Sequence, residues 1–262
     1  QIASISKSGI LGFGSMKYMG SKRVMLQNGL GKLLLEMANH SNRVFDPFCG
    51  SGIVTWYLAE KTNKQVIAGD LQEYSVVLAN AILLRTKALD QDEKLVLNDW
   101  LESVYEKFGD VEYAKVSEAE PDGILFERNK SAESTDFITK AYGGYYFSFR
   151  HAQAIDTLLK NLPEIPELRS IALAGLIEAA SACVASPGHT AQPFKPREKG
   201  LLAINEVWKR DLVKYARNTI ENLSNKHANV IGSACVCNAS NLLDDLKKND
   251  LVFLDPPYSS VQ

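Results

Sequence analysis

Two short runs combine residue types that could hold a polar ligand. The first covers residues 46–52 and reads Asp-Pro-Phe-Cys-Gly-Ser-Gly, directly after a short apolar run. Its glycines allow close approach of the backbone, and the N–H groups of a following helix would face an anion. The spacing differs from Gly-x-Gly-x-x-Gly, which disfavours a nicotinamide cofactor. Asp70 ends the next apolar run, where a carboxylate suits ribose hydroxyl groups. Taken alone, such a glycine turn can equally be structural.

The second run is Asp255-Pro256-Pro257-Tyr258, directly after the apolar residues 251–254. Two prolines fix an extended turn. The Asp255 carboxylate and the Pro256 carbonyl would then be two acceptors held close together, with Tyr258 as an aromatic plane beside them. Two acceptors and a plane suit a flat ring that carries an exocyclic amino group. A plain turn is the alternative, but the position at a strand end favours a site.

Hydrophobic spacing predicts the elements that must position both runs. Strands are expected over 43–45, 65–68, 230–237 and 251–254, and helices over 23–38, 53–61, 73–89, 150–161, 168–184, 202–223 and 239–247. Strand, glycine turn, helix, strand, acid and helix in succession indicate a doubly wound α/β sheet.

The β-α alternation is lost between about residues 90 and 228, where a surface loop is expected over 121–135 and a structured loop over 186–200. We therefore expect an α/β fold in which residues 16–89 and 229–262 form a Rossmann-like catalytic domain. A mainly helical insert, residues 90–228, would interrupt it.

The composition is that of an ordinary globular protein. The chain has 262 residues, of which 45% are hydrophobic and 23% charged, which excludes a disordered chain, a coiled coil and a disulfide scaffold. The net charge of −2 means that DNA binding would need a local positive patch. The four cysteines lack zinc-type spacing, and no metal site is expected. Without a signal sequence or a membrane-length apolar run, a cytoplasmic location is expected.

Both ends of the chain look unnatural. Gly14-Ser15-Met16 is typical of a cloning junction, so we expect residues 1–15 to be a vector-derived tail and Met16 to be the initiator. The chain stops four residues after Asp-Pro-Pro-Tyr, so we expect the sheet to be incomplete at its C-terminal side.

The two runs together resemble the S-adenosylmethionine-dependent amino-methyltransferases. Residues 17–23, Lys-Tyr-Met-Gly-Ser-Lys-Arg, are similar to the N-terminal motif of the Dam-like DNA adenine N6-methyltransferase family. The order of N-terminal motif, glycine motif, insert and Asp-Pro-Pro-Tyr is the family's alpha arrangement, in which the insert is the target-recognition domain. The resemblance covers about residues 16–84 and 229–262 well and the insert only loosely.

The resemblance implies S-adenosylmethionine as the cofactor. The glycine run would enclose the methionine part, Asp70 would hold the ribose, and Lys22 would lie between the cofactor pocket and the target site. At the adenine side, Asn238 departs from the acid that is usual in the family. The implied cofactor-binding residues are Tyr18, Gly20, Ser21, Lys22, Asp46, Pro47, Phe48, Gly50, Gly52, Asp70, Asn238 and Ala239.

The resemblance also implies direct methyl transfer to adenine N6 in a specific duplex DNA sequence, after the base has flipped out. Tyr258 would stack on the base, while Asp255 and the Pro256 carbonyl accept hydrogen bonds from its amino group; Pro257 completes this catalytic set. Asp in place of Ser at the first position favours adenine over cytosine. The implied partners are double-stranded DNA and a cognate restriction endonuclease that is not a stable subunit, in a prokaryote or phage.

Three weaker features of the insert could contact DNA. The aromatic run 140–150 could stack on bases or pack as a joining loop. The loop 186–194 could read base edges, although a lone His is more often structural. A basic stretch from 195 to 217 could bind phosphates or form a solvated helix face. The DNA-binding candidates are Tyr145, Tyr146, Arg150, His189, Gln192, Lys195, Arg197, Lys209, Arg210 and Lys214.

Two other functions stay open at this point. RNA and protein amino-group methyltransferases carry related sites, although the N-terminal motif and the large insert argue against them. The early stop motivates the second alternative, a non-catalytic DNA-binding fragment of a methyltransferase.

Overall fold

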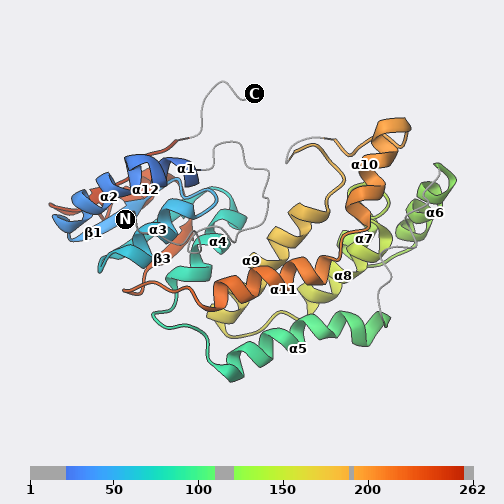
Figure 1. The fold of residues 1–262 in the computed structure, drawn as a ribbon, viewed down its shortest axis with the longest axis horizontal. Helices are drawn as coiled ribbons and strands as arrows, with labels where there is room; N and C mark the ends of the chain where they lie inside the picture. Colours follow the sequence, from blue (N-terminus) through green and yellow to red (C-terminus); the bar gives the residue numbers. More distant parts are fainter. Residues whose placement is uncertain (1–21, 110–120, 189–191, 257–262) are drawn as a thin grey trace, which may run out of the picture. The chain divides into compact units, whose positions relative to one another are not determined.

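The computed structural model describes residues 22–109, 121–188 and 192–256 (Figure 1). The chain divides into two compact units. Among the described residues, one unit holds 22–94, 163–174 and 223–256 and contains the sheet, and the other holds 95–109, 121–162, 175–188 and 192–222. The segment 163–174, which lies inside the expected insert, therefore groups with the sheet. The boundaries at 89/90 and 228/229 stay predictions.

A four-stranded parallel sheet forms the centre of the first unit. Its strands are β1 (Arg43–Asp46), β2 (Gln65–Asp70), β3 (Ser233–Val236) and β4 (Leu251–Val252), in the order β3-β2-β1-β4. From β1 the chain proceeds to β2 on one side, and β4 pairs with β1 on the other. In such sheets, ligands bind beyond the carboxyl ends of the strands where the strand order reverses. Here that point lies between β1 and β4, and the expected α/β fold is confirmed.

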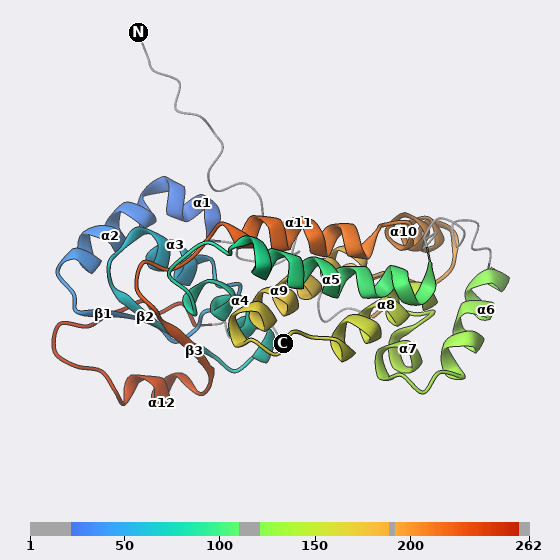
Figure 2. The same cartoon turned by 90° about the horizontal axis from the view of Figure 1, so that it is seen from below.

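Helices cover both faces of this sheet. They are α1 (Arg23–Met25), the π-helical turn η1 (Leu26–Leu30), α2 (Gly31–Asn39), α3 (Ile53–Lys61), α4 (Glu73–Leu83) and α12 (Ala239–Leu243). Figure 2 shows the strands between α2 and α3 on one side and α12 on the other. The indole N–H of Trp56 in α3 donates to the Leu78 carbonyl of α4 at 2.8 Å, which fixes these two helices against each other.

Some expected elements differ in extent from those in the structure. The helix expected over 23–38 is interrupted because Gly29 adopts φ 112°, a left-handed conformation that ends regular helix. The strand expected over 230–237 covers only Ser233–Val236, and the helix expected over 73–89 ends at Leu83.

The chain leaves and re-enters the sheet unit at neighbouring points. The Leu89 amide donates to the Ser224 carbonyl at 2.8 Å, and the Ala228 amide donates to the Arg85 carbonyl at 3.0 Å. The buried Arg85 guanidinium donates to the carbonyls of Leu223 and Lys226. Burial lowers the pKa of Arg85 to about 10. We call residues 85–89 and 223–228 the clasp.

The second unit is helical. Its elements are α5 (Gln91–Phe108), α6 (Pro121–Ala132), α7 (Phe137–Tyr142), α8 (Phe149–Lys160), α9 (Pro166–Cys183), α10 (Glu198–Trp208) and α11 (Leu212–Ser224), of which α5, α9 and α11 also have residues in the sheet unit. No helix in the described ranges is long and apolar enough to cross a membrane.

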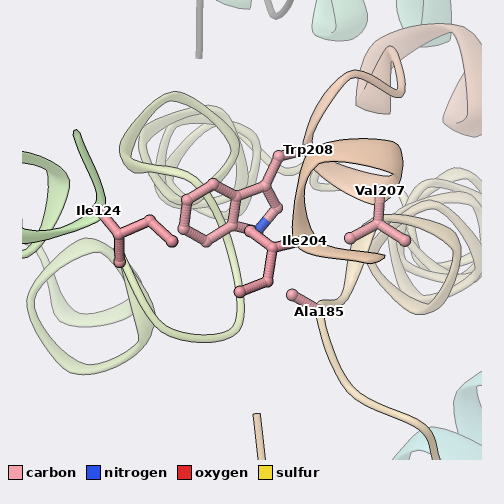
Figure 3. Close-up of a cluster of buried hydrophobic side chains, with 5 residues drawn as sticks. All are labelled: Ile124, Ala185, Ile204, Val207 and Trp208. Atoms are coloured by element: carbon pink, nitrogen blue, oxygen red, sulfur yellow. The ribbon is translucent and has the colours of Figure 1, made fainter. Parts of the chain in front are cut away.

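Two expectations for this unit are wrong. Residues 121–135 are not a surface loop, because 121–132 form α6, which Ile124 anchors in a buried cluster with Ala185, Ile204, Val207 and Trp208 (Figure 3). The single helix expected over 202–223 is two helices, α10 and α11. The break follows from Asp211, whose carboxylate accepts the Lys214 amide at 3.0 Å and so begins a new helix.

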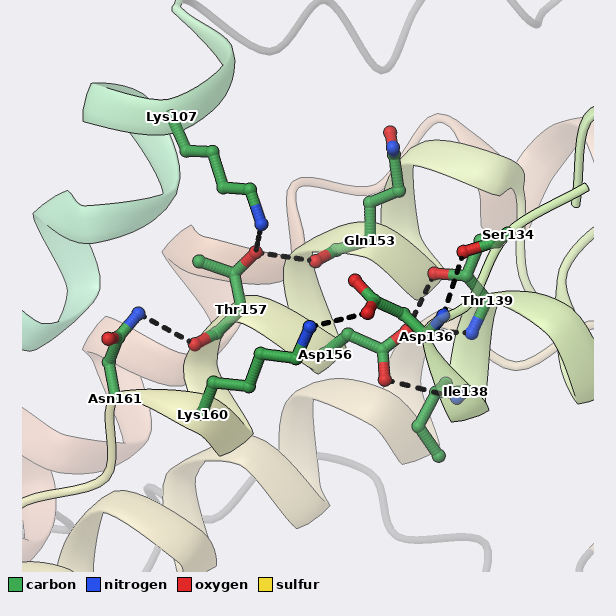
Figure 4. A network of polar contacts seen from close by, with 10 residues as sticks. All are labelled: Lys107, Ser134, Asp136, Ile138, Thr139, Gln153, Asp156, Thr157, Lys160 and Asn161. Atoms are coloured by element: carbon green, nitrogen blue, oxygen red, sulfur yellow. Dashed lines mark hydrogen bonds and ion pairs between the residues drawn. The ribbon is translucent and has the colours of Figure 1, made fainter.

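A polar network holds α7 against α8 (Figure 4). The buried Asp156 of α8 accepts the amides of Ile138 and Thr139 at 3.0 and 2.7 Å and the Thr139 hydroxyl at 2.6 Å. Amides in the first turn of a helix lack partners within the helix. Asp156 supplies the missing acceptors for these amides, so this carboxylate has a structural role.

Candidate active site at the carboxyl edge of the sheet

Three aspartates follow the carboxyl ends of neighbouring strands. Asp46 ends β1, Asp70 ends β2, and Asp255 comes three residues after β4. The negative charges of Asp255 and Asp70 both raise the pKa of Asp46. Asp46 and Asp255 therefore lie on either side of the point where the strand order reverses, and Asp70 lies at the end of the strand next to β1.

Asp46 is a buried carboxylate that is only half satisfied. Its Oδ2 accepts the Thr55 hydroxyl at 2.6 Å, whereas its Oδ1 has no hydrogen-bond partner among the described residues. Burial raises the pKa of Asp46 to about 6, and the Thr55 hydroxyl together with the nearby Phe48 amide offsets part of this effect. A buried acceptor without a donor is costly, so the site suits a ligand that brings an N–H or ammonium group.

Asp70 fastens the glycine run to the sheet. Its Oδ2 accepts the Gly50 amide and its Oδ1 the Gln72 amide, both at 2.9 Å. Gly50 and Gly52 have φ values of 48° and 75°, in the left-handed region that favours glycine. Pro47 is buried and Phe48 half-buried within the same turn. The run is thus held in one conformation beside Asp46.

Asp255 is paired with a lysine from the start of the described chain. Lys22 Nζ lies 2.9 Å from Asp255 Oδ2, and both side chains are largely shielded from solvent. The Phe253 amide donates to the Phe45 carbonyl at 2.9 Å, which continues the β4 pairing toward Asp255. Pro256 is exposed. Pro257 and Tyr258 lie outside the described residues, as do Tyr18, Gly20 and Ser21.

Asn238 and Ala239 lie at the start of α12, just beyond β3. The Asn238 side chain accepts the Ser240 amide at 3.2 Å and caps the helix. Asn and Asp are equally favoured at this position, so capping does not explain why Asn stands where the resemblance leads one to expect an acid. The adjacent Cys237 amide donates to the Asp70 carbonyl at 3.0 Å, so this segment is joined to the end of β2.

The aromatic candidates of the helical unit have mixed surroundings. Tyr145 is exposed, and the Arg128 guanidinium lies 4.2 Å from the centre of its ring. The backbone carbonyl of Tyr146 accepts the Ala185 amide at 2.7 Å. Arg150 donates to the Gln153 amide oxygen at 3.2 Å.

The basic candidates separate into two groups. Arg210 donates to the Ala182 carbonyl at 2.6 Å and pairs with Glu206 at 2.9 Å, and Arg217 pairs with Glu102 at 2.7 Å, so both guanidinium groups take part in internal contacts. The exposed candidates are Gln192, Lys195, Arg197, Lys209 and Lys214. His189 lies outside the described residues.

Sequence reasoning missed one residue of the candidate site, Thr55. Its hydroxyl is buried and bonded to Asp46, nine positions earlier in the chain. The available signal was a polar residue within the otherwise apolar stretch Ile53–Leu58, in the first turn after the glycine run.

Comparison with known protein families identifies the family to which this chain belongs. The model of the D12 class N6 adenine-specific DNA methyltransferases matches residues 18–262. The chain belongs to this family. No curated protein and no solved structure matches the chain. D12 methyltransferases transfer a methyl group from S-adenosylmethionine to N6 of adenine in DNA, so the expected enzyme class, cofactor and DNA substrate are confirmed.

The described residues of this D12 methyltransferase fit its cofactor. S-adenosylmethionine carries an ammonium group, a ribose and an adenine. The unsatisfied Asp46 Oδ1 suits the ammonium group. Each Asp70 oxygen accepts a single amide, which leaves acceptor capacity for ribose hydroxyls.

Proposed function

We propose that Asp255 and the Pro256 carbonyl bind the N6 amino group of the target adenine in this D12 methyltransferase. The observation that supports this most strongly is the Lys22–Asp255 pair, 2.9 Å apart, beside Asp46 at the reversal point of the sheet. It brings together the end of the N-terminal motif and the start of Asp-Pro-Pro-Tyr, 233 positions apart by subtraction of their numbers.

The Asp255 carboxylate accepts a hydrogen bond from N6 and so concentrates lone-pair density on that nitrogen. Lys22 orients this carboxylate through its ion pair. S-adenosylmethionine supplies the methyl group. Most of the acceleration comes from positioning and from fixed charges. Because the adenine amino group is paired in a duplex, the base must flip out to reach Asp255, and Tyr258 stacks on it.

The cofactor pocket follows the carboxyl edge from β1 to β3. Asp46, Pro47, Phe48, Gly50 and Gly52 enclose the methionine part, and Asp70 binds the ribose. At the adenine side the pocket is completed by Asn238 and Ala239. Tyr18, Gly20 and Ser21 are assigned to the amino-acid end by sequence alone.

Asp255→Ala tests this proposal. Methylation of duplex DNA should fall by at least about a thousandfold, because the only charged acceptor proposed for N6 is removed. Binding of S-adenosylmethionine, measured by calorimetry, should persist. Asp92→Ala, an exposed acid in the first turn of α5, is the matched control and should keep full methylation. Full activity of Asp255→Ala on DNA would contradict the assignment.

We further propose that the insert, residues 90–228, carries the DNA face, and that exposed Lys209 and Lys214 contact phosphates. Lys209→Glu combined with Lys214→Glu should reduce the slope of log affinity against log salt by about two, because each lost phosphate contact removes about 0.9. Lys61→Glu, an exposed charge at the end of α3, is the control. An unchanged slope in the double variant would place the DNA elsewhere.

We also propose that a cognate restriction endonuclease acts in the same prokaryotic cytoplasm. It does not bind stably to this chain. Its support is the family's sequence-specific adenine methylation, which would protect DNA. Methylation-sensitive sequencing of DNA from expressing cells would define the target sequence. DNA so modified should then resist the host's nuclease, and equal cleavage of modified and unmodified DNA would contradict this partner.

A further inference from the structure

A pair of thiols lies at the carboxyl end of β3, beside the proposed cofactor pocket. The Cys235 thiol donates to the Cys237 sulfur across 3.0 Å, and both residues are free cysteines. Cys235 is exposed and Cys237 half-buried. Side chains two positions apart on a strand point to the same face, which accounts for this approach.

The pair is joined to the end of β2 through backbone and packing. The Cys237 amide donates to the Asp70 carbonyl at 3.0 Å. A Cβ on Gly69 would lie 2.9 Å from the Cys237 sulfur and 3.1 Å from Leu242 of α12, so the absence of a side chain at 69 makes room for this sulfur. The position of Cys237 is therefore tied to that of Asp70.

We propose that Cys235 and Cys237 are a thiol–disulfide exchange site whose oxidation weakens binding of S-adenosylmethionine. The oxidant is a small-molecule disulfide such as oxidised glutathione. The Cys235 thiolate attacks one of its sulfurs, which breaks the glutathione disulfide, forms a mixed disulfide and releases one glutathione thiolate. The Cys237 thiolate then attacks the Cys235 sulfur and releases the second glutathione thiolate. The two cysteine protons pass to solvent and to the released thiolates.

The bond would deform the cofactor edge because of chain geometry. Two residues of extended strand span about 6.6 Å. Disulfides join Cα atoms that lie roughly 4.4–6.8 Å apart, with most nearer to 5.5 Å. A bond of the most common geometry therefore draws the two Cα atoms about 1 Å closer together and strains the hydrogen bond between the Cys237 amide and the Asp70 carbonyl. A strained disulfide of this kind is also readily reduced again, so the change is reversible.

The remaining cysteines serve as internal references. Cys49 and Cys183 are buried, and burial raises the pKa of both thiols, that of Cys183 to about 12. Exposed Cys235 is the accessible nucleophile of the four. Burial together with the Cys235 hydrogen bond raises the pKa of Cys237 to about 11, so Cys237 is the poorer first nucleophile of the pair.

The test treats the whole protein with oxidised glutathione and follows it by peptide mass spectrometry. The peptide that contains both cysteines should lose the mass of two hydrogen atoms. Cys237→Ser should instead keep one glutathione on Cys235, and Cys235→Ser should remain unmodified at Cys237. Calorimetry should show S-adenosylmethionine binding about tenfold more weakly to the oxidised protein, with recovery after dithiothreitol. Cys235→Ser should bind the cofactor equally before and after treatment.

Two results would overturn the proposal. One is the absence of the Cys235–Cys237 disulfide when folded protein is treated. The other is a disulfide that forms and leaves cofactor affinity unchanged. The inference rests on the proposed place of Asp70 in the pocket. That place has a separate readout, because Asp70→Ala in the reduced protein should itself weaken cofactor binding, whatever the thiols do.

Discussion

Two buried aspartates, one in each unit, show how differently a protein can use the same side chain. Asp156 in the helical unit accepts three hydrogen bonds from the start of α7. Asp46 in the sheet unit accepts one from Thr55, and its second oxygen has no partner among the described residues. Their exposed fractions are almost equal, 5% and 1%, so burial alone does not distinguish them.

The two carboxylates differ in the source of their hydrogen-bond donors. A carboxylate satisfied by backbone amides completes a fold, because removing it strands those amides. A carboxylate left with an unbonded oxygen carries a desolvation cost that protonation or a donor from a ligand relieves, and the raised pKa of Asp46 reflects that cost. Buried but incompletely bonded acids at a sheet edge thus indicate binding sites, whereas fully bonded acids indicate structure.

Replacing Asp156 should have the larger effect, and on stability. Asp156→Ala leaves the amides of Ile138 and Thr139 without an acceptor, and we expect the free energy of unfolding to fall by about 3 kcal/mol. Urea denaturation followed by circular dichroism measures this. Lys160→Ala, which removes only the exposed pair with Asp136, is the control and should cost less than about 1 kcal/mol. Equal losses of unfolding free energy in the two variants would contradict the structural role of Asp156.

Asp46 should make the affinity for S-adenosylmethionine depend on pH. The cofactor ammonium favours the ionised carboxyl, whose pKa in the free protein is about 6. Affinity for S-adenosylmethionine should therefore fall about tenfold between pH 7 and pH 5. The stability of the free protein changes with pH in the opposite direction to the cofactor affinity. Because the folded pKa lies above the ordinary 3.8, this group's contribution is complete below about pH 4 and is lost as pH rises through 6.

Asp46→Asn is the variant that checks this behaviour. Calorimetry across the same pH range should show weaker binding with this part of the pH dependence gone, since the amide does not titrate. If Asp46→Asn retained the full dependence, another group would be responsible and Asp46 would not face the cofactor.

The smallest expected effect belongs to Thr55→Val, which keeps the side-chain shape and removes the hydroxyl that lowers the pKa of Asp46. The midpoint of the binding profile should move upward by about half a pH unit, or about 0.7 kcal/mol. Ser240→Ala, at a hydroxyl bonded to Asn238, is a control remote from this carboxylate and should leave the midpoint in place. A downward shift in Thr55→Val would contradict the role given to the hydroxyl.

The sequence was informative where local pattern and chemistry coincide. The positions of Asp46, Asp70 and Asp255 after apolar runs predicted their place at strand ends, because parallel strands share one carboxyl edge. The helix over 53–61 was predicted to the residue, since a glycine turn starts it. The family resemblance, which the comparison confirms, rested on the same segments.

Long-range packing was not readable in the same way. The run 121–132 is polar and contains poor helix formers, yet it becomes α6 because Ile124 enters a buried cluster and Glu127 accepts the Phe149 amide at 2.6 Å. The internal contacts of Arg210 are equally invisible in a basic stretch. Local sequence patterns also do not indicate that Lys22 pairs with Asp255. Nor do they indicate that one oxygen of Asp46 has no hydrogen-bond partner among the described residues.

The clasp bears on how such an enzyme can diversify. Its hydrogen bonds hold the two ends of the segment 90–222 beside each other, independently of what lies between them. The entropy of closing a loop rises only slowly with its length, so a segment of different size and sequence can join the same two points at small cost. Exchange of the segment between relatives would leave the four strands and their three aspartates in place when the new segment again supplies the counterpart of residues 163–174, which group with the sheet. If the segment carries the proposed DNA face, target choice could then change in one recombination event while the chemistry is inherited unaltered.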